Sequence, residues 1–296
     1  MIALFLSSFL FGLANPLGAL MVGGEDSMIF TFQFLAALTL IQLPLVVTRW
    51  REVLKLNFKD GFSLLLISGL IGTFLYWCEF SSYQVGLPVT HVTFLMLTVP
   101  AWSMLYQYLR GRGSRRNFNM WGVALIGTAF LIQPNEKGQF SVGLLLPVFT
   151  SLLTAAWLIF SKKAQEKNIS PIVCSFFNDF FALIGVLGFM LYNGRQEAIL
   201  IMPDNAQNIM LYAGAIGVLP SILLLYGLRS TSLVAASTII MFDPVISGSL
   251  SLLINNEVLG ANFLIGSIFV CLSIIPENIG FTWERLKLVY SYIYDK

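Results

Sequence analysis

Residues 98–122 read TVPAWSMLYQYLRGRGSRRNFNMWG, and residues 242–266 read FDPVISGSLSLLINNEVLGANFLIG. The two stretches align without a gap at a displacement of 144 residues and share a proline, a serine and a glycine, in the pairs Pro100/Pro244, Ser103/Ser247 and Gly122/Gly266. A pair of glycines upstream recurs one residue further displaced, as Gly69/Gly214 and Gly72/Gly217. The second half of the chain is therefore expected to repeat the first.

The composition indicates a chain whose surface faces lipid. Of its 296 residues, 57% are apolar and 11% are charged, and the mean hydropathy is +0.80, whereas globular chains carry about a quarter charged residues. The net charge of +2 does not favour nucleic acid as a partner. No segment alternates with period two over about ten residues, as a membrane β-barrel requires. A soluble domain and a barrel are therefore excluded.

Apolar windows predict ten membrane-spanning helices of roughly 20 residues each. They lie at about 2–22, 29–48, 61–80, 87–108, 118–134, 141–161, 172–192, 207–228, 231–254 and 260–278. The first window lacks a basic segment before it and an Ala-x-Ala cleavage site, so we expect a span rather than a removable signal peptide. The predicted fold class is an all-α membrane protein of two five-helix repeats, at 1–136 and 137–280. Residues 281–296 are predicted to form an amphipathic cytoplasmic tail.

A repeat with an odd number of spans must sit in the opposite orientation from its copy. With both termini in the cytoplasm, the ten-span arrangement puts fifteen of the seventeen Lys and Arg inside, and leaves Lys137 and Arg195 outside. The RGRGSRR run at 110–116 is interpreted as a topogenic signal, and its counterpart around Asn256 has no basic residue. We therefore expect an integral protein of the inner or plasma membrane.

This pattern resembles a known family. Ten spans in two inverted halves, a proline midway along spans four and nine, and a glycine early in spans five and ten are similar to the EamA-like branch of the drug/metabolite transporter superfamily. The resemblance implies a central cavity between the halves, lined mainly by spans one, three, four, six, eight and nine. It also implies a carrier that works by alternating access.

The chain departs from the family pattern at two places. Relatives often carry an arginine in the second span, where this chain has Gln33. A Gly-Glu pair commonly follows the proline-containing span, whereas here Asn256 and Glu257 stand in the second half and Arg112 and Gly113 in the first.

The predicted cavity helices carry faces that mix small, aromatic and polar side chains, which suits a compact organic solute better than a bare ion. The candidate substrate-binding residues are Asn15, Tyr76, Glu79, His91, Trp102, Trp157 and Asp243. Glu79 lies near the outer end of its span, where it either reaches water or guards the external mouth. His91, the single histidine, has no companion for a metal site and is either a pore contact or a packing residue. Trp102 and Trp157 either wall the pocket, with cation–π capacity, or pack tightly.

Asp243 is the most informative single residue, because a charge midway through a span costs about 2.5–3.5 kcal/mol on insertion scales. No Lys or Arg lies in the interior of any predicted span. Asp243 is therefore interpreted as a contact for a cation or an ammonium group, as a proton-coupling site, or as a protonated structural residue. Asp179, beside Asn178, is a second intramembrane carboxylate. The two residues are interpreted as coupling or structural polar residues, and for Asp179 an interhelical hydrogen bond is favoured over a substrate contact.

The predicted function is secondary transport of a small polar or amphipathic metabolite, such as an amino acid or an amine-bearing compound. The alternative within this class is a broad exporter of hydrophobic cations, and a channel or an intramembrane aspartyl protease are remote alternatives. No nucleotide-binding, catalytic or metal motif is present, so no cofactor is expected and a gradient must supply the energy. The expected partners are the solute, the lipid bilayer, and protons or a counter-transported solute; the sequence does not determine the oligomeric state.

Overall fold

The computed structural model describes residues 2–22, 26–56, 61–111, 115–131, 142–199, 205–240, 242–255, 261, 264–269 and 272. Every described element is helical, as predicted. The elements are α1 (Ile2–Val22), α2 (Ser27–Val47), α3 (Trp50–Val53), α4 (Ser63–Gln84), α5 (Val89–Met96), α6 (Val99–Leu109), α7 (Arg115–Leu131), η2 (Val142–Leu144), α8 (Leu145–Glu166), α9 (Pro171–Tyr192), α10 (Gln196–Ile199), α11 (Ala206–Tyr212), η3 (Ala213–Val218), α12 (Leu219–Ser230), α13 (Leu233–Ile240) and α14 (Phe242–Asn255). The predicted tail at 281–296 lies outside the described residues.

Seven stretches of the described chain are long and apolar enough to cross a membrane. They correspond to predicted spans one to four and six to eight, at Ile2–Val22, Ser27–Val47, Ser63–Gln84, Val89–Leu109, Leu145–Glu166, Pro171–Tyr192 and Ala206–Ser230. Trp121–Leu131 and Phe242–Leu253 are apolar but shorter. Most of the predicted tenth span falls outside the described residues, so the number ten stays a prediction.

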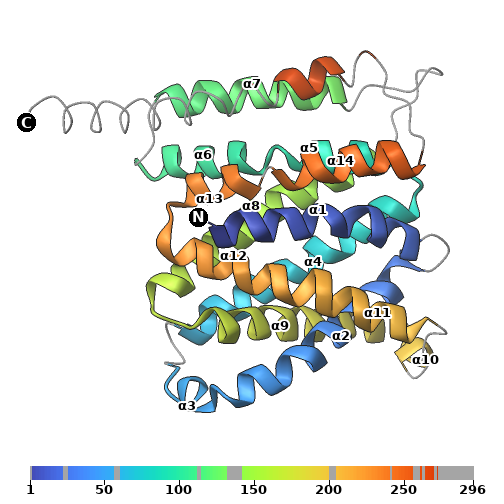
Figure 1. Ribbon diagram of the computed structural model, residues 1–296, viewed down its shortest axis with the longest axis vertical. Coiled ribbons are helices and arrows are strands. Elements are labelled where there is room, and N and C mark those ends of the chain that lie inside the picture. The colour runs from blue at the N-terminus through green and yellow to red at the C-terminus, as the bar shows by residue number, and fades with distance from the viewer. Residues whose placement is uncertain are drawn as a thin grey trace, which may run out of the picture.

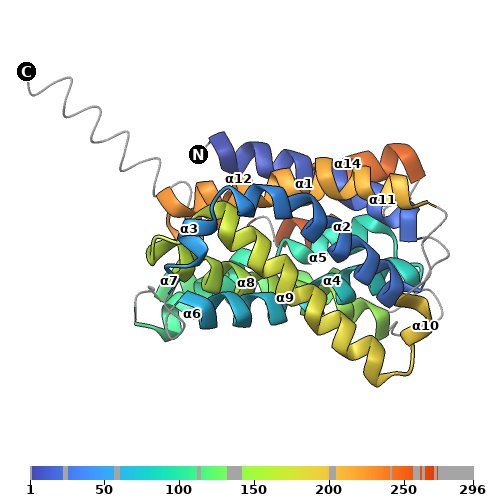
Figure 2. The ribbon, with the colours of Figure 1, turned by 90° about the horizontal axis from the view of Figure 1, so that it is seen from below.

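The long helices lie side by side in one bundle (Figures 1 and 2). Helix α1 packs against α12 and α14, and α4 packs against α8 and α9. Helix α2 packs against α9 and η3, while α5 contacts α14. The two interrupted helices, α5/α6 and α13/α14, therefore contact each other, and both also contact α1 and α8.

Both interruptions lie just before a proline. A proline has no N–H to bond the carbonyl four residues earlier, and in helices this weakens the turn before it. Between α5 and α6 the backbone narrows to a tighter turn, in which the Thr98 N–H donates to the Leu95 carbonyl at 3.2 Å. Between α13 and α14 the carbonyl of Ile240, the group that Pro244 leaves unpaired, accepts a hydrogen bond from the Ser8 hydroxyl of α1 at 3.1 Å. Helix α1 thus stabilises the break beside Asp243.

One glycine brings α1 close to α14. A Cβ atom added at Gly12 would lie 2.7 Å from Cβ of Ile246 and 3.1 Å from the carbonyl oxygen of Asp243. These separations are shorter than van der Waals contact, so only glycine allows this approach. The position of Asp243 relative to α1 therefore depends on Gly12.

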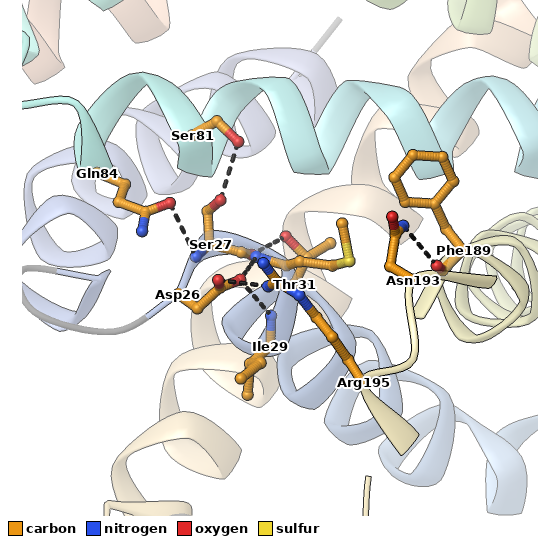
Figure 3. Close-up of polar contacts among 10 residues, drawn as sticks. Asp26, Ser27, Ile29, Thr31, Ser81, Gln84, Phe189, Asn193 and Arg195 are labelled. Carbon is orange, nitrogen blue, oxygen red and sulfur yellow. Dashed lines mark hydrogen bonds and ion pairs between the residues drawn. The ribbon is translucent and has the colours of Figure 1, made fainter. Parts of the chain in front are cut away.

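A polar cluster ties α2 to α4 and to the segment after α9 (Figure 3). The Asp26 carboxylate caps α2 by accepting from the backbone N–H of Met28 at 2.9 Å, and it also forms an ion pair with Arg195. The backbone N–H of Ser27 donates to the Gln84 side chain of α4 at 3.1 Å. Asp26 therefore has two roles, of which the cap contributes more, because an exposed ion pair is worth about 0–1 kcal/mol.

We expect Asp26→Ala to destabilise the protein more than Arg195→Ala does. The first change removes both the ion pair and a helix cap worth about 1 kcal/mol, whereas the second removes the ion pair alone. Thermal unfolding of the purified variants in detergent measures the difference, with Asp26→Asn as the control that keeps a capping oxygen. Equal losses for the two alanine variants would show that the cap contributes nothing.

Candidate functional site

A cavity lies between the helices at the level of the two breaks. Its empty volume, including its open mouth, is about 1040 Å³. Its walls come from α1, α4, α5, α6, α8, α11, η3, α12, α13 and α14, with one residue from α2. These are the spans that the family resemblance implied, and Phe34 of α2 is the addition.

Asp243 faces this cavity from the first turn of α14. It is 9% exposed, and its Oδ1 accepts a hydrogen bond from the side-chain amide of Asn15 at 3.1 Å. The break between α13 and α14 places the carboxyl at a helix start, where exposed N–H groups favour negative charge. Oδ2 has no hydrogen-bond partner among the described residues. One oxygen of the carboxyl is therefore available to a solute.

Glu79 faces the same cavity from α4, one turn after Tyr76. It is partly buried, and it makes no hydrogen bond or ion pair with another described residue. The lining contains no Lys, Arg or His among the described residues. The cavity therefore presents two carboxyl groups and no basic side chain to whatever enters it.

Aromatic rings form much of the remaining wall. The ring of Phe34 lies 5.7 Å from that of Tyr76 and 5.2 Å from that of Tyr212, measured between centroids. The Tyr212 hydroxyl donates to the backbone carbonyl of Ala14 at 3.2 Å, which fixes its ring against α1. Trp157 of α8 also lines the cavity. Aromatic faces attract cations, so these walls complement the carboxyl groups.

A second buried carboxyl group, that of Asp179, lies outside the cavity lining. Asp179 of α9 is 4% exposed and does not line the cavity. It accepts hydrogen bonds from the Gln42 amide at 2.6 Å and from the Tyr76 hydroxyl at 3.5 Å, so α2, α4 and α9 meet at this residue. The side-chain amide of the neighbouring Asn178 donates to the hydroxyl of Ser161 at 3.3 Å.

Of the nine predicted site residues, five line the cavity: Asn15, Tyr76, Glu79, Trp157 and Asp243. His91 and Trp102 are not among the lining residues. The indole N–H of Trp102 donates to Ser151 at 3.0 Å, and its ring packs near Trp121, which is the packing alternative considered for it. A substrate contact for either residue stays a prediction.

Sequence reasoning missed several lining residues. On the fourth span Met96 and Val99 line the cavity, whereas the sequence predicted a face that includes His91 and Trp102. That face assumed one continuous helical period, which the break between α5 and α6 interrupts. Phe34 and Tyr212 also line the cavity, and each is one of many aromatic residues in apolar spans. No sequence signal separates them from packing residues.

Comparisons with known proteins agree with this architecture. Residues 141–276 match the model of the EamA-like transporter family. A solved structure described as "Crystal structure of protein" is similar in fold, with a TM-score of 0.60 at 14% sequence identity, covering 92% of this chain and 93% of that chain. No curated protein matches the chain.

The family match agrees with the apolar helices of the described chain. EamA-like proteins are transporters and not enzymes, so the cavity has no catalytic role to explain. The chain is an integral membrane protein whose residues 141–276 match the EamA-like transporter family.

Proposed function

We propose that the chain is a secondary active transporter of a small amphipathic solute that carries a positive charge, such as an amine-bearing metabolite. The observation that supports this substrate class is the cavity itself, in which Asp243 and Glu79 face aromatic walls and none of the described lining residues is basic. An ammonium group satisfies the carboxyl oxygens, and an apolar body packs on the rings. An amino acid fits by its ammonium group, while its carboxylate finds no basic partner among the described lining residues.

Alternating access is supported by the way both halves contribute to the cavity. Positions related by the sequence displacement line it in pairs: Met96/Ile240 and Val99/Asp243 at 144 residues, and Gly72/Gly217, Tyr76/Ser221 and Glu79/Leu224 at 145. The helix contacts are related in the same way. Helix α1 packs against α12, and α8, the counterpart of α1, packs against α4, the counterpart of α12. Two equivalent halves around one site can rock between two openings.

The pairing also reveals an asymmetry that matters for binding. The counterpart of Glu79 is Leu224, and the counterpart of Asp243 is Val99. Each half therefore contributes one carboxyl group, but at positions that the repeat does not relate. A solute held by both groups is bound in one defined orientation, which favours a specific carrier over an unselective pore.

The distribution of basic residues supports an orientation with both termini in the cytoplasm. The ends of α2, α6, α8 and α12 lie together at the left of Figure 1. The basic residues of the described chain belong mainly to these ends, with Arg49, Arg110, Lys162 and Arg229 among them. If the ends of α2, α6, α8 and α12 face the cytoplasm across an inner or plasma membrane, these basic residues follow the positive-inside rule.

A broad exporter of hydrophobic cations is the second candidate, and the extent of the aromatic wall favours it. Both candidates need the carboxyl groups, but they differ in selectivity. A specific carrier recognises the shape of one solute, whereas a broad exporter accepts unrelated cations on its rings.

Thermal-shift measurements on the purified protein test the proposal. The probes are matched pairs such as phenethylamine and phenethyl alcohol, followed by a metabolite library that includes amino acids. A ligand at a hundred times its dissociation constant stabilises the folded state by about 2.7 kcal/mol. We expect the amine to raise the melting temperature and the alcohol to leave it unchanged; equal shifts, or none for any amine, would contradict the proposed substrate class. Stabilisation by tetraphenylphosphonium and dyes, with none by metabolites, would favour the exporter.

A further inference from the structure

We infer that Asp179 is a proton-binding site, separate from the substrate cavity and linked to it through Tyr76, whose carboxyl group releases and regains a proton during transport. The link to transport rests on the proposed function, whereas the proton site itself does not. The argument starts from burial, because Asp179 is 4% exposed and lies between α2, α4 and α9.

No described cation compensates a charge on Asp179. The titratable side chains that face it are Tyr76 from α4 and Cys174 from its own helix, and α2 presents Gln42. The charged residues of α8 and α12 lie in their last turns, where Lys162 donates to the backbone carbonyls of Leu228 and Thr231, and Arg229 to Asn168. A bare carboxylate in such a place is costly, so a proton is the natural partner for part of the cycle.

The contacts of Asp179 suit both of its protonation states. In the structure the Gln42 amide N–H donates to Oδ2 of Asp179 at 2.6 Å, a contact that suits a carboxylate. The other end of this amide, Oε1 of Gln42, is buried and has no hydrogen-bond partner among the described residues. A 180° rotation of the Gln42 side-chain amide brings Oε1 to the carboxyl group, where it accepts a hydrogen bond from the O–H of a protonated Asp179. Gln42 can therefore satisfy the group with and without its proton.

A path for the proton runs toward the start of α9. Asp179 lies eight residues into this helix, about 12 Å from its first residue at 1.5 Å per residue. On this side Oδ1 of Asn178 and the hydroxyl of Ser175 are buried without hydrogen-bond partners among the described residues. Unpaired buried polar atoms in native proteins usually bind ordered water. In the proposed orientation this path leads to the cytoplasm.

Tyr76 connects the proton site to the solute. Its side chain lines the cavity, and its hydroxyl lies 3.5 Å from Oδ1 of Asp179. A positive charge bound at Asp243 or Glu79 favours the ionised form of a nearby carboxyl group through a medium of low dielectric constant. Entry of the cation therefore promotes release of the proton from Asp179, and return of the proton promotes release of the cation. This exchange is antiport, with one proton moving against one cation.

Infrared difference spectroscopy tests the proton site without any substrate. In Asp243→Asn protein labelled with carbon-13 aspartate, Asp179 is the only aspartate left inside a described helix. We expect a carboxylic-acid C=O band that disappears as the pH rises, and we expect it to be lost in the double variant with Asp179→Asn. The asparagine keeps the size of the side chain and its contacts with Gln42 and Tyr76. Identical spectra for the single and double variants would overturn the inference.

Two further measurements keep the test decisive. If the double variant does not fold, Gln42→Leu on the Asp243→Asn background must shift the frequency of the same band, and an unshifted band would overturn the assignment to Asp179. On wild-type protein in weak buffer, phenethylamine is expected to release protons, with a loss of release in Asp179→Asn. Unchanged release would contradict the link through Tyr76. Failure of every amine to bind would refute the proposed function, while the infrared titration would still decide whether Asp179 binds a proton.

Discussion

Asp243→Asn is expected to abolish uptake of positively charged amines by reconstituted proteoliposomes. The substitution keeps the hydrogen bond to Asn15 in reach but removes the negative charge that faces the cavity. Loss of one partner from a buried charge pair costs about 2–5 kcal/mol, which corresponds to a loss of at least about thirtyfold in affinity. Uptake of radiolabelled amine and thermal shifts with the same amine measure the effect.

Two other carboxyl variants make this prediction specific. Glu79→Gln should also weaken uptake, because Glu79 faces the same cavity. Glu52→Gln is the control, since Glu52 follows α2 and forms an exposed ion pair with Arg49, whose hydrogen bond lowers the pKa of the Glu52 carboxyl. The control should transport normally. If Asp243→Asn protein takes up amines at the wild-type rate at acidic and neutral pH alike, Asp243 is a structural residue and the proposed site is wrong.

Gly12→Ala is expected to have the second large effect. The new methyl group would lie 2.7 Å from Cβ of Ile246 and 3.1 Å from the backbone carbonyl of Asp243. Helix α1 must then move away from α14, which stretches the hydrogen bond between Asn15 and Asp243. Overpacking of this kind costs about 1–3 kcal/mol, so we expect a lower melting temperature together with weaker binding of the amine.

Gly188→Ala is the matched control, because a Cβ atom at Gly188, four residues before the end of α9, would meet nothing within 4 Å. An alanine in an exposed helix interior is favoured over glycine by about 1 kcal/mol, so this variant should be as stable as wild type or more so. If Gly12→Ala behaves like this control in both stability and binding, the close approach of α1 to α14 does not position Asp243.

The helices were predictable because lipid imposes a simple rule on the sequence. Spans must be apolar and about 20 residues long, and seven of the ten predicted windows correspond to helices that meet this criterion in the described chain. The paired prolines, Pro100 and Pro244, lie just after the points where the central helices are interrupted. The match to EamA-like transporters covers residues 141–276, which lie within the predicted second repeat.

The cavity was predictable where helices are regular and not where they break. On α4 the helical period brings Gly72, Tyr76 and Glu79 to one face, and all three line the cavity. The two parts of the fourth span, α5 and α6, do not share one helical period, and His91 and Trp102 are not among the lining residues. Local periodicity describes one helix at a time.

Contacts between helices could not be predicted from the sequence, for a related reason. A predicted interhelical hydrogen bond for Asp179 is present, but nothing in the sequence identified Gln42 and Tyr76 as its partners. Nor did it show that Ser8 binds the carbonyl freed by Pro244. Such pairs depend on the rotation and depth of neighbouring helices, which packing decides.

The central claim is that the cavity between the halves binds a positively charged solute by its carboxyl groups. A structure of the protein with a bound amine chosen by the thermal-shift screen tests this claim most directly. The account predicts the ammonium nitrogen within hydrogen-bonding distance of the Asp243 carboxyl, with the body of the solute between Tyr76 and Trp157. An amine bound elsewhere on the protein, or one seated in the cavity with its nitrogen turned away from both Asp243 and Glu79, would contradict it.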